Sequence, residues 1–266
     1  MYVATGYRAY SIPYLVPRCL RLARDLLIIP DRLHRGAVAI AVSTIGLLIA
    51  CFIQYAYVEK HQLTNSFFYD RLQFSFVDGG YPEIFGYGLE LAAFALFALF
   101  AWVRRKPQWY ACAAILFLTF LDDAFGLHET VGGVVASGFG VSPVIGDLIG
   151  FASTGLLSAA CWLAGARLIH SEQDWLPYLV FTAYIGILVF FGVGVDAVHG
   201  MLGKEVSQTL LTVIEDGGEL TTTALISLSA FGMWRRQRRA VTASRVPMSP
   251  VLPTNPTTGH RLEKAA

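Results

Sequence analysis

Six long apolar runs occupy most of this chain and limit its possible folds more than any other feature. Each is long enough to cross the hydrocarbon of a bilayer, which takes roughly 20 helical residues. Inside lipid a helix satisfies its own backbone hydrogen bonds. The sequence therefore predicts an all-α integral membrane protein, a six-transmembrane-helix bundle with spans at about 36–58, 83–103, 109–131, 143–166, 176–200 and 208–234.

Composition supports this class and excludes others. The 266 residues are 55% hydrophobic and 15% charged, and the mean hydropathy is +0.54, which is too apolar for an ordinary soluble domain. A formal net charge of +1 gives no global basic field for nucleic acid. The four cysteines are far apart and form no Cys-x-x-Cys pair, so we expect small buried hydrophobic side chains rather than disulfides or a zinc knuckle.

The basic residues predict the orientation, because Lys and Arg favour the cytoplasmic loops. They are frequent in residues 1–35, at 104–106 and at 235–239. The alternate loops are poorer in them: 132–142 has none, and 201–207 has one. Both termini are therefore expected in the cytoplasm. The protein would be a multi-pass protein of the cell membrane, which is the inner membrane if the source is Gram-negative.

Charge and hydropathy along the chain divide it into three parts. Residues 1–35 interleave arginines with leucines, which predicts a basic amphipathic N-terminal helix on an anionic membrane surface. Residues 36–239 would form the transmembrane domain. Residues 240–266 are rich in Pro, Ser and Thr, which predicts a disordered cytoplasmic tail.

Acidic and histidine side chains interrupt three of the apolar runs. A charged side chain in hydrocarbon costs about 2.5–3.5 kcal/mol on insertion scales, so each needs a metal ion, a proton, water or a protein partner. Intramembrane ionisable residues are functional candidates for that reason. The residues are Asp122, Asp123, His128 and Glu129 in the third run, Asp196 and His199 in the fifth, and Glu215, Asp216 and Glu219 in the sixth.

Their depth and spacing bring them to one level of the bundle. With a helical rise of 1.5 Å per residue, all lie about 20 Å or more from the predicted cytoplasmic ends, in the outer leaflet. Three pairs share a helical face by spacing, namely Asp122 with Glu129, Asp196 with His199, and Glu215 with Glu219. Three helices would thus each offer two side chains with oxygen or nitrogen atoms that can bind a ligand. We therefore expect spans three, five and six to meet directly.

Carboxylates with one or two imidazoles suit a divalent transition metal such as Zn, Fe or Mn. Helical bundles build such sites from inward side chains on facing helices. The predicted metal ligands are Asp122, Glu129, Asp196, His199, Glu215 and Glu219. Asp123 and His128, which point to either side of the Asp122 face, are the candidate catalytic residues, as a general base or an orienting group.

Two functions compete on this pattern. The first is a metal-dependent integral-membrane enzyme acting on a lipid or another membrane-borne substrate, as a hydrolase or a di-metal oxidoreductase. The alternative is a proton- or cation-coupled transporter that uses the same acids. A haem bound by His128 and His199, or a purely structural polar network, is weaker. The expected partners are the bilayer and a lipid substrate, and no nucleic acid.

The sequence leaves the roles of two further acids open. Glu90 lies well inside the second run, either as a member of the cluster or as a lone protonated glutamate. Asp147 lies in the first turn expected for the fourth helix, where an acid is favoured by the helix dipole.

Overall fold

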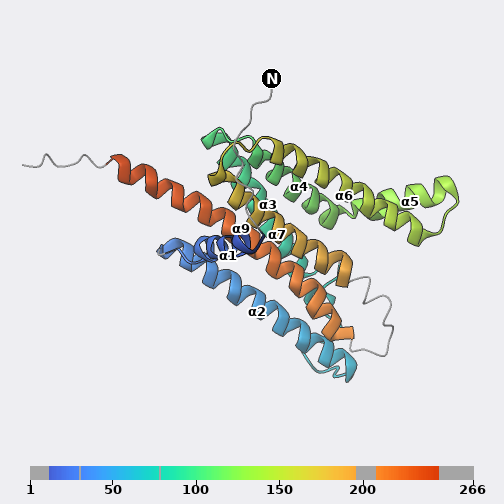
Figure 1. Cartoon of the computed structure of the whole chain (residues 1–266). Helices are drawn as coiled ribbons and strands as arrows, with labels where there is room; N and C mark the ends of the chain where they lie inside the picture. Colours follow the sequence, from blue (N-terminus) through green and yellow to red (C-terminus); the bar gives the residue numbers. More distant parts are fainter. Residues whose placement is uncertain (1–11, 30, 78, 196–207, 246–266) are drawn as a thin grey trace, which may run out of the picture.

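The computed structural model describes residues 12–29, 31–77, 79–195 and 208–245, and every regular element in these ranges is a helix. In chain order they are α1 (Ile12–Leu27), α2 (Arg32–Lys60), η1 (Leu72–Phe74), α3 (Tyr81–Arg104), α4 (Gln108–Phe125), α5 (Leu127–Phe139), α6 (Pro143–Arg167), α7 (Glu172–Val189), η2 (Phe190–Val195) and α9 (Gln208–Arg245). The fold is all-helical, as predicted (Figure 1).

Four segments are long and apolar enough to cross a membrane: Arg32–Lys60, Tyr81–Arg104, Leu148–Arg167 and Gln173–Val195. The bent pair formed by α4 and α5 makes a fifth if it counts as one span. Among the described residues the chain therefore has four to five candidate spans. The predicted sixth segment forms α9, which is a helix but is not among the candidates.

α9 occupies the middle of the bundle, and this position explains its polarity. Helices α1, α2, α3 and α7 pack against it (Figure 1). The side chains of Thr222, Thr223, Ser227 and Ser229 are buried there, and the Ser227 hydroxyl donates to the Leu89 carbonyl at 2.6 Å. A helix shielded by protein on many sides can carry hydroxyls that bond to backbone carbonyls, so its average hydropathy is low.

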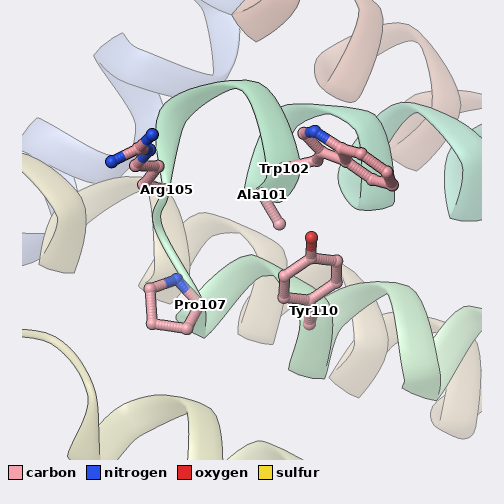
Figure 2. A pocket seen from close by; sticks show the side chains of 5 residues that line it. All are labelled: Ala101, Trp102, Arg105, Pro107 and Tyr110. Carbon is pink, nitrogen blue, oxygen red and sulfur yellow. The ribbon is translucent and has the colours of Figure 1, made fainter.

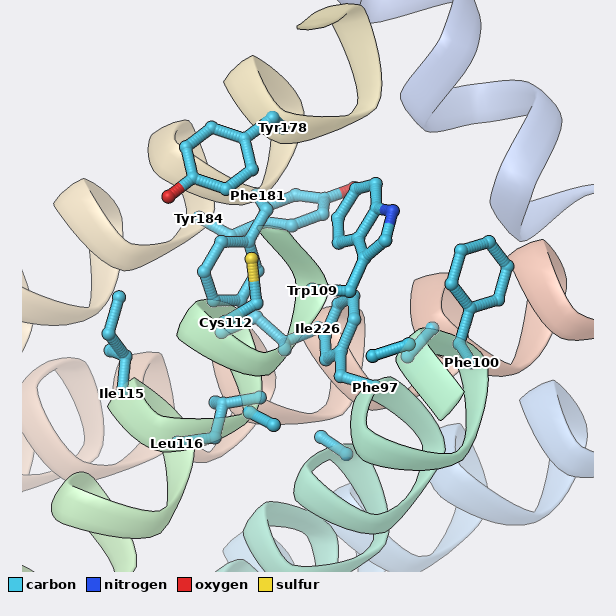
Figure 3. Close-up of a cluster of buried hydrophobic side chains, with 14 of the residues drawn as sticks. Phe97, Phe100, Trp109, Cys112, Ile115, Leu116, Tyr178, Phe181, Tyr184 and Ile226 are labelled. Atoms are coloured by element: carbon cyan, nitrogen blue, oxygen red, sulfur yellow. The ribbon is translucent and has the colours of Figure 1, made fainter. Parts of the chain in front are cut away.

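An aromatic core joins α3, α4 and α7 near their Lys- and Arg-rich ends. Trp109 is 1% exposed and stacks on Phe97, with ring centroids 5.6 Å apart and an interplanar angle of 11° (Figure 3). Phe100 and Tyr178 cover its other sides. Packing of these large rings holds α3, α4 and α7 together at this end of the bundle.

The helix predicted over 109–131 is wrong as a continuous element. α4 ends at Phe125, Gly126 adopts a left-handed conformation with φ +57°, and α5 leaves at an angle of 67°. Glycine reaches this conformation without a steric cost. α5 then lies close on α6, since a Cβ on Gly150 would sit 2.0 Å from the His128 carbonyl oxygen.

Ion pairs tie the basic end together. Arg235 of α9 pairs with Asp31, the N-cap of α2, and Lys106 pairs with Asp174. α1 packs on α7 and α9 through the buried Leu26. Within the predicted segment 1–35 the described residues thus contain a helix at Ile12–Leu27, and its expected place on an anionic membrane surface stays a prediction. α9 continues past residue 239 to Arg245, beyond the predicted end of the transmembrane domain.

A shallow pocket of about 430 Å³ lies at the turn from α3 to α4, at this same basic end. Trp102 and Tyr110 face each other across it, and Arg105 points away from both (Figure 2). Its single cation and exposed rings are typical of a membrane interface.

Candidate functional site

An acidic pocket lies at the opposite end of the bundle, where α3 begins, α4 ends and α9 begins. Its volume is about 520 Å³. None of the described residues that line it is Lys or Arg. Seven carboxyl groups and one imidazole line it: Glu83 and Glu90 of α3, Asp122 and Asp123 of α4, His128 and Glu129 of α5, and Asp216 and Glu219 of α9.

Helical periodicity places the acids of α3 and α9. Glu83, Tyr87 and Glu90 are four and three residues apart, so they form one stripe. Asp216 and Glu219 form a matching stripe on α9. The two helices pack against each other, and a Cβ on Gly86 would be in ordinary contact with Leu220 at 3.6 Å. Two acidic faces therefore border the same space.

Asp122 and His128 form a local pair at the break between α4 and α5. Asp122 Oδ1 accepts a hydrogen bond from the His128 backbone N–H at 2.8 Å and lies 3.0 Å from His128 Nδ1. Because a carboxylate has no donor, Nδ1 carries the hydrogen, and Nε2 is left to act on other groups. The imidazole is also stacked on Phe151, with centroids 3.8 Å apart.

Hydrogen bonds around Glu83 and Tyr87 hold the edge of the pocket together. The Tyr87 hydroxyl lies 2.8 Å from Glu83 Oε2 and 3.1 Å from the backbone oxygen of Asp123. The Gly79 N–H also donates to Glu83 Oε2 at 3.1 Å. This network ties the start of α3 to the end of α4, and it holds the Glu83 carboxylate in place.

Glu90 is the most buried acid of the pocket, at 2% exposure. Its neighbours include the carboxyl groups of Asp122, Asp123 and Glu219. One of its oxygens, Oε2, is buried and has no hydrogen-bond partner among the described residues. Buried polar groups are nearly always satisfied, so this oxygen is a candidate contact for a bound ligand or a water molecule.

The π-helical segment η2 forms the wall behind Glu219. A Cβ on Gly192 would lie 2.2 Å from Glu219 Oε1, and one on Gly218 would lie 2.4 Å from the Phe191 ring. The glycine at 218 therefore leaves room for the Phe191 ring between η2 and α9. π-helical turns are frequent at functional sites, and this one packs against the helix that supplies Glu219.

The structure brings five of the eight predicted site residues to this pocket: Asp122, Asp123, His128, Glu129 and Glu219. Glu215 lies on α9 but does not line it. Asp196 and His199 fall outside the described residues. The predicted shared face of Asp122 and Glu129 is wrong, because the helix breaks at Gly126 between them.

Sequence reasoning did not assign Glu83 to the site, it named Asp216 as a candidate without giving it a role, and it left Glu90 open. The signal that could have found Glu83 and Glu90 was their seven-residue spacing, which puts both on one face. The expected direct meeting of spans three, five and six is confirmed in part. α7 and η2 pack against α9, and α4 meets α7 through Trp109 and Tyr178. α3, which was not part of that expectation, packs against both α4 and α9.

Metal ligation remains a prediction. Within the described ranges, no group of three or more His, Cys, Asp or Glu side chains is arranged to hold a metal ion. The cysteines are free, as expected, and Cys112 is buried. The side chain of Asp147 lies outside the description, so its predicted capping role stays a prediction.

Comparisons with known proteins identify a family and no closer relative. No curated protein and no solved structure matches the chain significantly. One family model, described as Domain of unknown function (DUF8692), matches residues 35–233. That range contains every residue that lines the acidic pocket. The chain therefore belongs to the DUF8692 family.

Proposed function

We propose that the acidic pocket binds a divalent transition metal, and that the protein is a metal-dependent enzyme of the cell membrane acting on a lipid or another membrane-borne substrate. The observation that carries this proposal is Glu90, whose buried Oε2 has no hydrogen-bond partner among the described residues, in a pocket lined by six further carboxyl groups. A buried unsatisfied polar group costs about 1–3 kcal/mol, and more when it is charged. A bound cation would remove that cost.

The contacts divide the acids by role. Asp122 Oδ1 already accepts from His128, so its first task is to hold the imidazole. Glu90 interacts electrostatically with both Asp123 and Glu219, and these three acids are the better candidates for metal ligands. The metal would activate water for hydrolysis, and His128 would present Nε2 to the pocket as a general base. Asp196 and His199 remain proposed ligands from the neighbouring segment.

The proposed orientation follows from charge. Arg104, Arg167 and Arg235 lie at the end of the bundle away from the acidic pocket. By the positive-inside rule that end faces the cytoplasm, which puts both termini there and the pocket in the outer leaflet. α9 would be the sixth span, shielded from lipid by its neighbours.

The test is metal content and affinity. Full-length protein purified in mild detergent would be analysed for bound elements, then titrated with Mn²⁺ and Zn²⁺ by calorimetry. We expect about one ion per chain, and Glu90→Gln should weaken binding by about tenfold or more. Asp25→Asn removes an acid that is paired with arginines at the opposite end, so it should bind like the wild type. Wild-type protein that binds neither ion would refute the proposal.

A second function has one observation in its favour. Glu90 and Asp123 are neighbouring carboxyl groups that line one pocket, as the acids of a proton relay are. The alternative is therefore a proton- or cation-coupled transporter. It would be supported by proton or cation flux in liposomes that Glu90→Gln abolishes in protein that carries no stoichiometric metal.

A further inference from the structure

The acidic pocket is larger than a metal site. Its volume is about 520 Å³. A water molecule takes a share of about 30 Å³ in the liquid, so a metal ion with its bound waters fills only part of this space. Pockets of roughly 300–1,000 Å³ are those that take small organic ligands. An organic group can therefore enter beside the ion.

The charge of the pocket restricts that group. One divalent ion carries two positive charges, whereas seven carboxyl groups line the pocket. The described lining residues include no Lys or Arg that could receive a phosphate, a sulfate or a carboxylate. Such an anion would be repelled from most directions, whereas a cation would be attracted from all four helices that supply the acids.

The walls also carry aromatic rings. Phe76, Tyr87 and Phe125 line the pocket together with the acids. Ring faces attract ammonium groups, and quaternary ammonium ligands are commonly recognised by such rings. Phe76 is held against Phe52 of α2, with centroids 5.0 Å apart, so this wall is attached to the bundle.

Apolar side chains continue outward from the pocket. Phe125 is 66% exposed, and Phe67 and Leu72 in the connection between α2 and α3 are 64% and 57% exposed. This connection also supplies Phe76 and Gly79 to the lining. An alkyl chain attached to a group in the pocket could lie on this surface.

We infer that the pocket recognises an organic ammonium group, in contact with the carboxylate of Glu90 and the surrounding rings. This inference rests on the proposed function, because it takes the same pocket as the substrate site. The source is either a small free amine or the cationic headgroup of an amphiphile whose chain lies along Phe125.

The experiment compares probes of matched shape. Choline, its uncharged isostere 3,3-dimethyl-1-butanol, and methyl phosphate would each be titrated into the full-length protein in a maltoside detergent. We expect choline to bind about tenfold or more tightly than the isostere, and methyl phosphate not to bind. Hexyltrimethylammonium distinguishes the sources: an amphiphile site binds it more tightly than choline, and a site for a free amine does not.

Variants connect the binding to Glu90. Glu90→Gln should weaken choline binding by about tenfold, and Asp25→Asn should leave it unchanged. If Glu90→Gln fails to fold, Asp123→Asn at the neighbouring carboxyl group takes its place. Equal binding of choline and its isostere, preferred binding of methyl phosphate, or full binding by the pocket variant would overturn the inference.

Metal titrations on the same sample separate the two proposals: Mn²⁺ binding without choline binding rejects the inference alone, and choline binding without metal rejects the metalloenzyme alone.

Discussion

Replacing Asp122 with Ala should loosen the junction between α4 and α5. The change removes the acceptor for two groups of His128, the backbone N–H at 2.8 Å and the ring Nδ1 at 3.0 Å. Loss of a helix cap costs about 0.5–2 kcal/mol, and loss of a further hydrogen bond costs about 0.5–1.5 kcal/mol. Both side chains are largely shielded, at 15% and 20% exposure, so screening by water is limited.

The expected loss of stability is therefore about 2 kcal/mol. For a domain of this size each kcal/mol shifts the Tm by about 2–4 °C, so Asp122→Ala should lower the Tm by about 4–8 °C. The assay is thermal unfolding in detergent, together with hydrogen exchange of the first amides of α5. Exchange should increase there and remain unchanged in α2.

Asp122→Asn provides the matched control, because it keeps one acceptor oxygen and should lose less than half as much. The decisive comparison is between metal-loaded and chelator-treated protein. If Asp122 is a cap, the Tm difference is the same in both. A difference that appears only in the metal-loaded protein would refute this reasoning and make Asp122 a metal ligand.

Three other predictions concern packing and topology. Gly150→Ala should lower the Tm by several degrees, since its Cβ would lie 2.0 Å from the His128 carbonyl oxygen, whereas Gly133→Ala, with open space around it, should not. Trp109→Ala should destabilise the protein by about 3–5 kcal/mol in chemical unfolding, because the ring is 1% exposed among aromatic neighbours. A cysteine placed at residue 138 should react with an impermeant maleimide on intact cells, and one at residue 106 should not. The opposite labelling pattern would reverse the orientation.

Local patterns were enough to predict the helical fold and its candidate membrane spans. Hydropathy over about 20 residues depends only on neighbouring side chains, so four of the predicted spans appear as helices of suitable length and apolarity. Counting residues from the basic ends also placed the acids of two helices at the same end, because the rise per residue in a helix is constant.

The junction at Gly126 could not be read from a periodic pattern. A helical wheel assumes an unbroken helix, and one residue with φ +57° rotates everything after it. Asp122 then meets His128 six residues later, and the expected partnership of Asp122 with Glu129 on one face is lost. Gly126 and Asp122 are both present in the sequence. The bend that they form also depends on the close packing of α5 against α6.

What the sequence by itself determined is therefore the class of protein, its candidate spans and the end of the bundle that carries the acids. The tertiary structure decided which acids share a pocket. It placed α3 between α4 and α9, so that Glu83 and Glu90 joined the site and Glu215 did not line it. It also made the polar α9 a central helix. The physical reason is that helix formation and membrane insertion respond to local composition, whereas the neighbours of a side chain depend on how whole helices pack.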